Sequence, residues 1–117
     1  MSMKTRITIL GDGAMGTACA LILAARPDFD VTLWSQFPAN AEALRRDREN
    51  KPFLPDVPIP DRITITSDFH EAREADGFVV AIPTIYLSST LDRLKADWPR
   101  QGAEPIVVSV VKGIERE

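Results

Sequence analysis

The feature that most constrains this chain is a glycine-rich run that joins an apolar stretch to an alanine-rich stretch. The run is Gly11-Asp12-Gly13-Ala14-Met15-Gly16, which has the spacing G-x-G-x-x-G. Residues 7–10 before it are mainly apolar and typical of a buried strand, and residues 17–25 after it are typical of a helix. A strand, a tight glycine turn and a helix start in this order predict a binding site for the pyrophosphate of a dinucleotide. The alternative is that the glycines only mark a turn.

Each glycine of the run has an expected task in such a site. Gly11 permits the sharp turn out of the strand, and Gly13 lets the backbone approach the phosphates without a Cβ in the way. Gly16 allows the helix to pack close to the sheet. The free N–H groups of the first helical turn, together with the positive end of the helix dipole, would then face the anion.

Apolar runs alternate with helical stretches along the whole chain. The pattern predicts strands at residues 6–10, 31–34, 62–66, 77–82 and 106–111, and helices at 14–25, 39–47, 68–74 and 86–96. The last two strands are apolar on both faces, as expected for a parallel sheet covered by helices on both sides. We therefore predict a single α/β domain over residues 1–117, with a doubly wound, Rossmann-type parallel sheet of about five strands and helices on both faces.

One segment breaks this alternation. Residues 52–60 hold four prolines in nine residues, so they form neither a helix nor a central strand. We expect an ordered, extended connector that crosses over the sheet, because proline fixes φ and stiffens the path of the chain. The segment also carries apolar side chains that need a surface to pack on, which argues against a freely solvated spacer. These side chains are Phe53, Leu54, Val57 and Ile59.

Composition excludes several classes of partner and location. The formal charge of −3 at pH 7 argues against nucleic acid as a partner, and Arg45, Arg46 and Arg48 have no aromatic platform beside them. No apolar run approaches the ~20 residues of a membrane span, and the N-terminus lacks the apolar region of a signal peptide. The single cysteine, Cys19, excludes an internal disulfide and fits a reducing compartment. We expect a cytoplasmic protein without a membrane span.

A more selective pattern lies outside the glycine run. Its parts are Trp34, Arg48-x-Asn50, Phe53-Leu54-Pro55, the pairs Val57-Pro58 and Ile59-Pro60, Ile63, Thr66-x-Asp68, Ala75-Asp76, Ala81-Ile82-Pro83-Thr84 and Val111-Lys112-Gly113-Ile114-Glu115. On these residues the chain resembles the N-terminal, cofactor-binding domain of the NAD(P)-dependent glycerol-3-phosphate dehydrogenase family. The resemblance covers essentially the whole chain but only the first part of the family's usual length, which continues into a helical substrate domain.

The resemblance implies an activity and roles for particular residues. The family uses NAD or NADP to reduce dihydroxyacetone phosphate to sn-glycerol 3-phosphate, a step of glycerol-3-phosphate metabolism that serves phospholipid biosynthesis. By this resemblance, the backbone of Ala14 and Met15 holds the pyrophosphate, Gln36 lies beside the adenosine ribose and Tyr86 lies near the cofactor. Lys112 contacts both cofactor and substrate, and it is the one catalytic residue implied in this chain.

The predicted sheet supports these placements independently. Ligands of open parallel sheets bind beyond the carboxyl ends of the strands. Four of the candidate residues follow directly on such ends, so that one crevice can hold them. They are Gly11, Gln36, Pro83 and Lys112. A lysine there could supply charge to a substrate phosphate or polarise the ketone oxygen as hydride arrives, and its alternative is a solvated lysine at a strand terminus.

The choice between NAD and NADP stays open at this stage. Asp12 occupies a position where small neutral residues are common, and its carboxylate would repel a pyrophosphate unless it points away or finds a donor. The strand at 31–34 is followed by Ser35-Gln36, whereas NAD sites have an acid there that holds the ribose 2′-hydroxyl. Nothing at that point repels a 2′-phosphate, and Arg45 or Arg46 on the next helix could reach one.

The family's general acid, a second lysine, belongs to the helical domain that these residues lack. We therefore expect the chain alone to bind cofactor weakly and to catalyse nothing, because hydride transfer needs both halves closed around the nicotinamide. The strand at 106–111 would lie at a sheet edge, where copies of the chain could pair.

Two alternatives remain from the sequence. The first is the cofactor domain of another dehydrogenase, such as a ketopantoate reductase or a hydroxyisobutyrate dehydrogenase, against which the Phe-Leu-Pro connector argues. The second is a stand-alone nucleotide-sensing Rossmann module, against which Lys112-Gly113 argues. His70, the only histidine, is interpreted as a solvated side chain, and no metal-ligand cluster is visible, so no metal site is expected.

Overall fold

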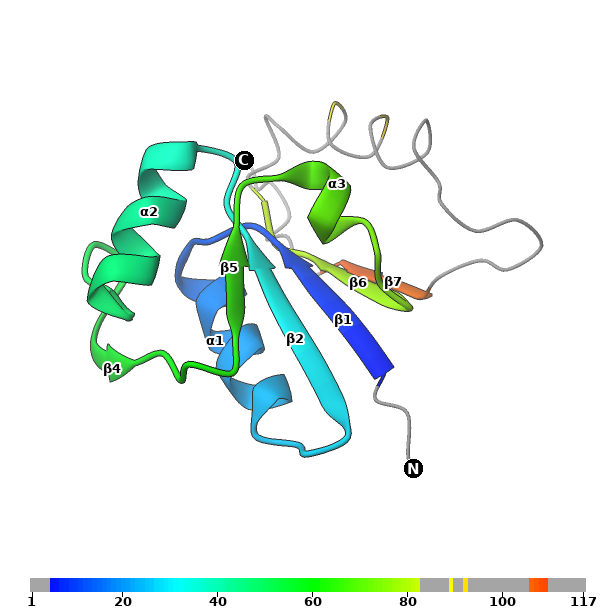
Figure 1. Cartoon of the computed structure of the whole chain (residues 1–117), viewed down its shortest axis with the longest axis horizontal. Helices are drawn as coiled ribbons and strands as arrows, with labels where there is room; N and C mark the ends of the chain where they lie inside the picture. The colour runs from blue at the N-terminus through cyan, green and yellow to red at the C-terminus, as the bar shows by residue number, and fades with distance from the viewer. Residues whose placement is uncertain (1–4, 83–88, 90–91, 93–105, 110–117) are drawn as a thin grey trace, which may run out of the picture.

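The computed structural model describes residues 5–82, 89, 92 and 106–109. These residues form a five-stranded parallel sheet in the order β5-β2-β1-β6-β7 and a separate two-stranded sheet of β3 and β4 (Figure 1). The strands of the large sheet are β1 (Thr5–Leu10), β2 (Phe29–Trp34), β5 (Thr64–Thr66), β6 (Gly77–Val80) and β7 (Ile106–Ser109). Because β1 pairs in parallel with both β2 and β6, its end at Leu10 lies between Trp34 and Val80.

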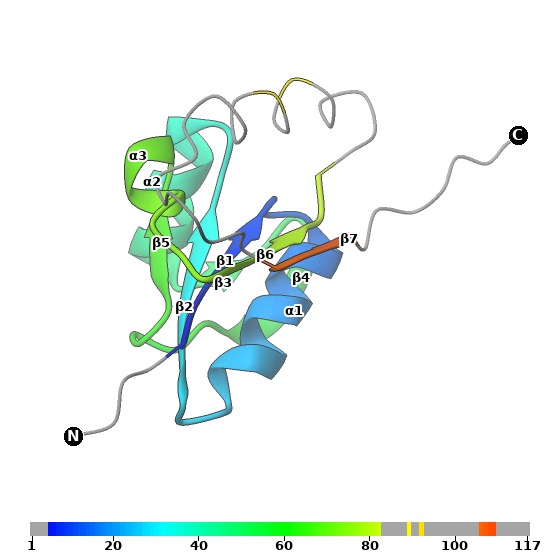
Figure 2. The same cartoon turned by 90° about the vertical axis from the view of Figure 1, so that its right-hand side faces the viewer.

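Helices cover both faces of the large sheet, as predicted. α1 (Ala14–Ala24) and α2 (Pro38–Asp47) lie on one face, and α3 (Phe69–Ala72) lies on the other (Figures 1 and 2). The right-handed twist of parallel strands favours such crossovers on alternate faces. The expected Rossmann-type α/β fold is confirmed. No helix in the described ranges is both long and apolar enough to cross a membrane.

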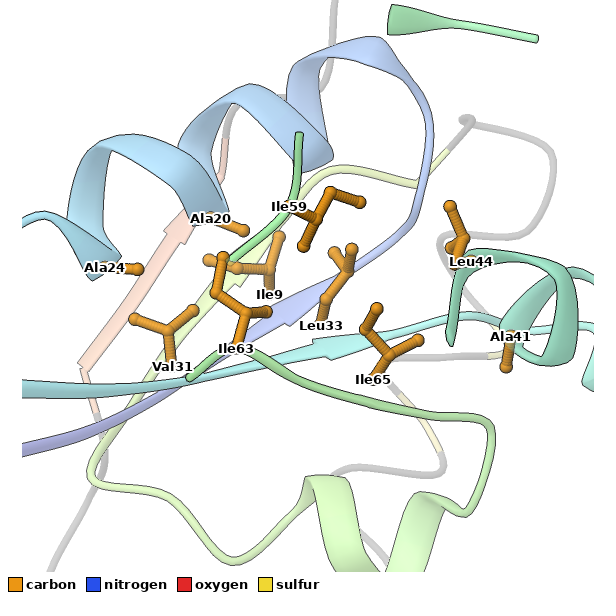
Figure 3. Close-up of a cluster of buried hydrophobic side chains, with 10 residues drawn as sticks. All are labelled: Ile9, Ala20, Ala24, Val31, Leu33, Ala41, Leu44, Ile59, Ile63 and Ile65. Atoms are coloured by element: carbon orange, nitrogen blue, oxygen red, sulfur yellow. The ribbon is translucent and has the colours of Figure 1, made fainter. Parts of the chain in front are cut away.

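The core under α1 and α2 joins aliphatic side chains of the strands and of the segment between β4 and β5 to alanines and one leucine of the helices (Figure 3). Its buried members are Ile9, Ala20, Ala24, Val31, Leu33, Ala41, Leu44, Ile59, Ile63 and Ile65. Alanines on the inner face of α1 let the helix approach the sheet closely. This packing fixes the start of α1 above the carboxyl end of β1.

The opposite face has an aromatic core. Trp34 and Phe69 pack edge to face with ring centroids 5.4 Å apart, and Phe78 is buried beside them in the same cluster. Asp68 caps the start of the short helix α3, and its carboxylate accepts a hydrogen bond from the backbone N–H of His70 at 2.9 Å.

The elements that were predicted have boundaries within two residues of the observed ones in the described part of the chain. β2 begins at Phe29 rather than residue 31, and α3 ends at Ala72 rather than residue 74. α1 and α2 begin and end within one residue of their predicted bounds. β5 begins at Thr64 rather than residue 62, and β6 ends at Val80 rather than residue 82. Most of the helix predicted at 86–96 lies outside the described residues. The two residues of this stretch that the structure describes, 89 and 92, are helical. β7 lies at one edge of the sheet.

The proline-rich segment is more structured than the extended connector we expected. β4 (Leu54–Pro58) pairs antiparallel with β3 (Glu49–Asn50), and we call this unit the β3–β4 hairpin. As predicted, the segment is neither helix nor central strand. Ile59 is buried in the main core, but Phe53 is 58% exposed, against the expectation that it would be covered. The hairpin supplies its own pairing, so Phe53 is not needed to anchor it.

Arg48 connects α2 to this hairpin. It ends the helix in the left-handed conformation, with φ of 49°, which is costly for a residue with a Cβ. Its guanidinium donates to the carbonyl oxygens of Pro60 at 3.2 Å and Ile63 at 2.9 Å. These charge-assisted bonds offset the backbone cost and tie both ends of the connector together.

Candidate functional site

The glycine turn, residues 11–16, leaves the sheet at the carboxyl end of β1. Gly11 has φ of +123°, a conformation that residues with side chains rarely adopt. A Cβ at this position would also lie 2.5 Å from the carbonyl oxygen of Ala81. The backbone N–H of Gly11 donates to the carbonyl of Trp34, and that of Ala81 donates to the carbonyl of Leu10. Gly11 therefore lies between the ends of β1, β2 and β6, where only glycine fits.

The other two glycines of the turn differ sharply in their surroundings. A Cβ on Gly16 would collide with the carbonyl group of Gly11, so the first turn of α1 can pack against the glycine turn only if residue 16 is glycine. A Cβ on Gly13 would meet nothing within 4 Å. Its φ of −74° is ordinary for any residue. Nothing in the described protein requires Gly13 to be glycine, whereas a ligand that must touch the backbone would require it.

The start of α1 is open to such a ligand. Gly13 is the N-cap residue, no side chain caps the helix, and no acidic residue lies in its first turn. Ala14 is exposed, and Met15 is 51% exposed. The N–H groups of the first turn need an acceptor, and the helix dipole makes an anion the favourable one. The residues present therefore fit a pyrophosphate.

The carboxylate of Asp12 has a hydrogen-bond donor. This meets one of the two conditions under which a carboxylate is tolerated beside a pyrophosphate. The Oγ of Ser35 donates to Oδ2 of Asp12 at 2.7 Å. Ser35 is fully buried at the end of β2, where its backbone N–H donates to the carbonyl of Thr66. The carboxylate thus points along the sheet edge toward β2.

A buried amide holds the back of the glycine turn. Nδ2 of Asn50, on β3, donates to the backbone carbonyl of Asp12 at 2.7 Å and to Oγ1 of Thr17 at 2.8 Å. Sequence reasoning included Asn50 in a family pattern but gave it no task, and it gave none to Ser35 or Thr17. The contacts join residues 33 to 38 positions apart, so only the folded chain reveals them.

A hollow of about 90 Å³ opens beside Asp12, between α2 and the β3–β4 hairpin. Its lining includes Asn40, Phe53 and Asn50. It carries three carboxylates and one lysine, which are Asp12, Asp47, Glu49 and Lys51. A hydrogen bond from Arg46 lowers the pKa of Asp47, whose side chain is therefore ionised at neutral pH. The hollow is acidic.

The remaining predicted site residues fall into two groups. Gln36 follows Ser35 at the end of β2 and is half-buried, close in sequence to the donor of Asp12. Pro83, Tyr86 and Lys112 lie outside the described residues. The structure thus brings together the glycine turn, Ser35 and Gln36 at one end of the sheet. His70 is exposed on α3, as interpreted from the sequence.

Comparisons with known proteins agree with this arrangement. The family model described as the N-terminus of NAD-dependent glycerol-3-phosphate dehydrogenase matches residues 6–117. The chain is 38% identical to a glycerol-3-phosphate dehydrogenase [NAD(P)+] of Syntrophomonas wolfei, over 94% of this chain and 31% of that protein. It is 40% identical to the enzyme of that name in Moorella thermoacetica, over 98% of this chain and 33% of that protein.

A solved structure is similar over nearly the whole chain. The crystal structure of glycerol-3-phosphate dehydrogenase from Coxiella burnetii matches with a TM-score of 0.83 and 28% identity, covering 95% of this chain and 33% of that one. The chain therefore spans about a third of the length of the relatives that it matches. The family match selects glycerol-3-phosphate dehydrogenase over the ketopantoate and hydroxyisobutyrate types left open by the sequence.

Proposed function

This chain belongs to the NAD-dependent glycerol-3-phosphate dehydrogenase family, as its N-terminal NAD(P)-binding domain, and we propose that it serves one particular reaction. It is the cofactor-binding half of an oxidoreductase that transfers hydride between NAD(P)H and dihydroxyacetone phosphate to give sn-glycerol 3-phosphate. The names of the relatives support the reaction class.

The observation that carries the proposal is the open space at Gly13 beside an uncapped helix start. The cofactor's pyrophosphate lies against Gly11, Gly13 and Gly16 and accepts hydrogen bonds from the backbone of Ala14 and Met15. Bound there, the nicotinamide cofactor supplies the hydride. The chain's own part is to bind and orient it, since positioning provides much of the reduction in barrier.

Further residues complete the proposed site. Gln36 lies beside the adenosine ribose, because it follows Ser35 directly at the end of β2. Pro83 and Tyr86 contact the cofactor, and Lys112 contacts cofactor and substrate; these three rest on the family resemblance and on the motif spacing of the sequence. The ammonium group of Lys112 would polarise the ketone or hold the substrate phosphate.

We place the general acid and the grip on the glycerol phosphate in a helical substrate domain outside these 117 residues. The relatives' length, about three times that of the chain, supports this division. On this proposal the chain alone binds cofactor without catalysing reduction, and the enzyme works in the cytoplasm.

The test is a titration of the 117-residue chain with NADH and with NADPH, followed by nicotinamide fluorescence. We expect saturable binding of at least one of them, and loss of that binding in Gly13→Ala, which keeps the fold because its Cβ meets open space. Dihydroxyacetone phosphate added to the complex should leave the nicotinamide absorbance unchanged. Binding of neither cofactor contradicts the proposal, and substantial reduction by the chain alone contradicts its division into two halves.

A further inference from the structure

We propose that Asp12 is the acid that recognises the adenosine ribose in this chain, in place of the acid that NAD sites carry after the second strand, and that it makes the domain prefer NAD to NADP. The inference rests on the proposed function, since it names the cofactor that the same site selects. It assigns a task to the one residue of the glycine turn that does not suit a pyrophosphate.

The carboxylate of Asp12 lies at the end of the second strand, β2. In NAD sites the ribose-binding acid follows the second strand because the ribose lies beyond the carboxyl end of that strand. Here β2 ends at Trp34 and is followed by Ser35, which is fully buried. Oγ of Ser35 donates to Oδ2 of Asp12 at 2.7 Å, so a carboxylate lies at the end of β2 although it belongs to the glycine turn.

Asp12 is fixed from three sides. The N–H of the preceding Gly11 donates to the carbonyl of Trp34 at 3.0 Å. Asn50 donates to the carbonyl of Asp12 at 2.7 Å. Oγ of Ser35 also lies 3.2 Å from the carbonyl oxygen of Phe37, but its single proton goes to the nearer and charged acceptor. A binding group held in this way needs no rearrangement when its ligand arrives.

The carboxylate of Asp12 can accept further hydrogen bonds besides the one from Ser35. A carboxylate accepts about four hydrogen bonds, so the bond from Ser35 leaves room for ribose hydroxyls. Asp12 is half-buried and lines the acidic hollow, so a ligand in the hollow can reach it. The 2′-hydroxyl of NAD is a donor and suits this group. The 2′-phosphate of NADP is an anion with acceptors only, and it would lie against a fixed negative charge.

The arginines that could compensate a 2′-phosphate have other partners. Arg45 donates to the carbonyl of Ile65 at 3.1 Å and to Glu42 at 3.0 Å, and Arg46 donates to Asp47 at 3.2 Å. Lys51 is the lysine of the hollow, and its Nζ lies 3.9 Å from Oδ2 of Asp47. At this end of β2 the described part of the chain therefore offers a 2′-phosphate more negative than positive charge.

The experiment compares dissociation constants for NADH and NADPH in the wild-type chain and in Asp12→Asn. We expect the wild type to bind NADH at least about tenfold more tightly, and Asp12→Asn to reduce this ratio about tenfold, mainly by improving NADPH binding. This substitution keeps the volume of the side chain and an acceptor for Ser35. The matched control is Asp28→Asn, which removes one exposed carboxylate at the opposite end of the sheet, where it pairs with Arg26, and should change the ratio by less than about twofold.

A second variant, Ser35→Ala, tests whether the carboxylate of Asp12 must be held in place as well as charged. It also provides the test if Asp12→Asn fails to fold. It removes the donor and keeps the charge, so we expect weaker NADH binding with the preference for NADH retained. A wild type that prefers NADPH, an unchanged ratio in Asp12→Asn, or a reversed preference in Ser35→Ala overturns the inference and leaves the proposed function intact. Binding of neither cofactor by the wild type overturns both.

Discussion

The glycine turn and the β3–β4 hairpin meet at Asp12, yet they are held in place by different kinds of force. The turn depends on missing atoms, since Gly11 and Gly16 leave no space for a Cβ. The hairpin depends on polar groups, since Asn50 and Arg48 donate hydrogen bonds to carbonyls far away in the sequence. The turn should therefore fail when an atom is added, and the hairpin should fail when a donor is lost.

The strongest test of the steric side is Gly16→Ala. The new Cβ meets a backbone carbonyl that cannot move without breaking the turn, so we expect a loss of about 3 kcal/mol or more in the free energy of unfolding. Urea denaturation followed by tryptophan fluorescence measures it. Gly13→Ala is the matched control and should stay within about 0.5 kcal/mol of the wild type. If both variants are equally stable, crowding does not shape this turn.

The strongest test of the polar side is Asn50→Asp, which keeps the size and removes the donor. A carboxylate then faces the carbonyl of Asp12, and we expect a loss of about 2 to 3 kcal/mol at neutral pH. The loss should shrink at acidic pH, because a protonated acid can donate again. Asn40→Asp makes the same change on the exposed side of the hollow, and it should cost less than about 0.5 kcal/mol. An equal cost for both variants would mean that Asn50 acts only through charge.

Arg48→Ala tests whether the connector is tied down by its guanidinium. The carbonyl of Ile63 loses its guanidinium donor, and that of Pro60 keeps only the backbone N–H of Ile63. The left-handed backbone at residue 48 remains, so we expect a loss of about 2 kcal/mol. Arg46→Ala provides the comparison, since its ion pair with Asp47 is exposed and should contribute less than about 1 kcal/mol. Thermal unfolding followed by circular dichroism measures the stability loss of each variant. A larger loss in Arg46→Ala than in Arg48→Ala would contradict the prediction.

The smallest effect should come from Asp47→Asn. The hydrogen bond from Arg46 lowers the pKa of Asp47 in the folded chain, so its contribution to stability is present above the unfolded pKa and is lost as pH falls through the folded one. The unfolding curves of wild type and variant should therefore differ slightly at neutral pH and converge in acid. Curves that diverge in acid would contradict this sign.

These two regions also explain how far the sequence could predict the structure. The turn, α1 and β1 were predicted nearly to the residue, because the sequence pattern that signals them lies within one short stretch of the chain. The pairing of β3 with β4 was missed because prolines hide a strand pattern, and Phe53 was wrongly expected to be covered. The sequence indicated that the carboxylate of Asp12 needs a hydrogen-bond donor or must point away from the phosphates. It could not identify Ser35 as that donor, because the two residues are 23 positions apart. The roles of Pro83, Tyr86 and Lys112 stay predictions.

On the proposed function, a dinucleotide binds at the carboxyl end of the sheet with its pyrophosphate on the glycine turn. The most direct measurement is a titration of the ¹⁵N-labelled chain with NAD⁺, followed through the chemical shifts of the backbone amides. We predict saturable shifts that are largest at Gly13, Ala14 and Met15, with smaller ones at Ser35 and none at the opposite end of the sheet, at Arg26 and Asp28. Shifts confined to the opposite end, or no saturable shift, would contradict the account.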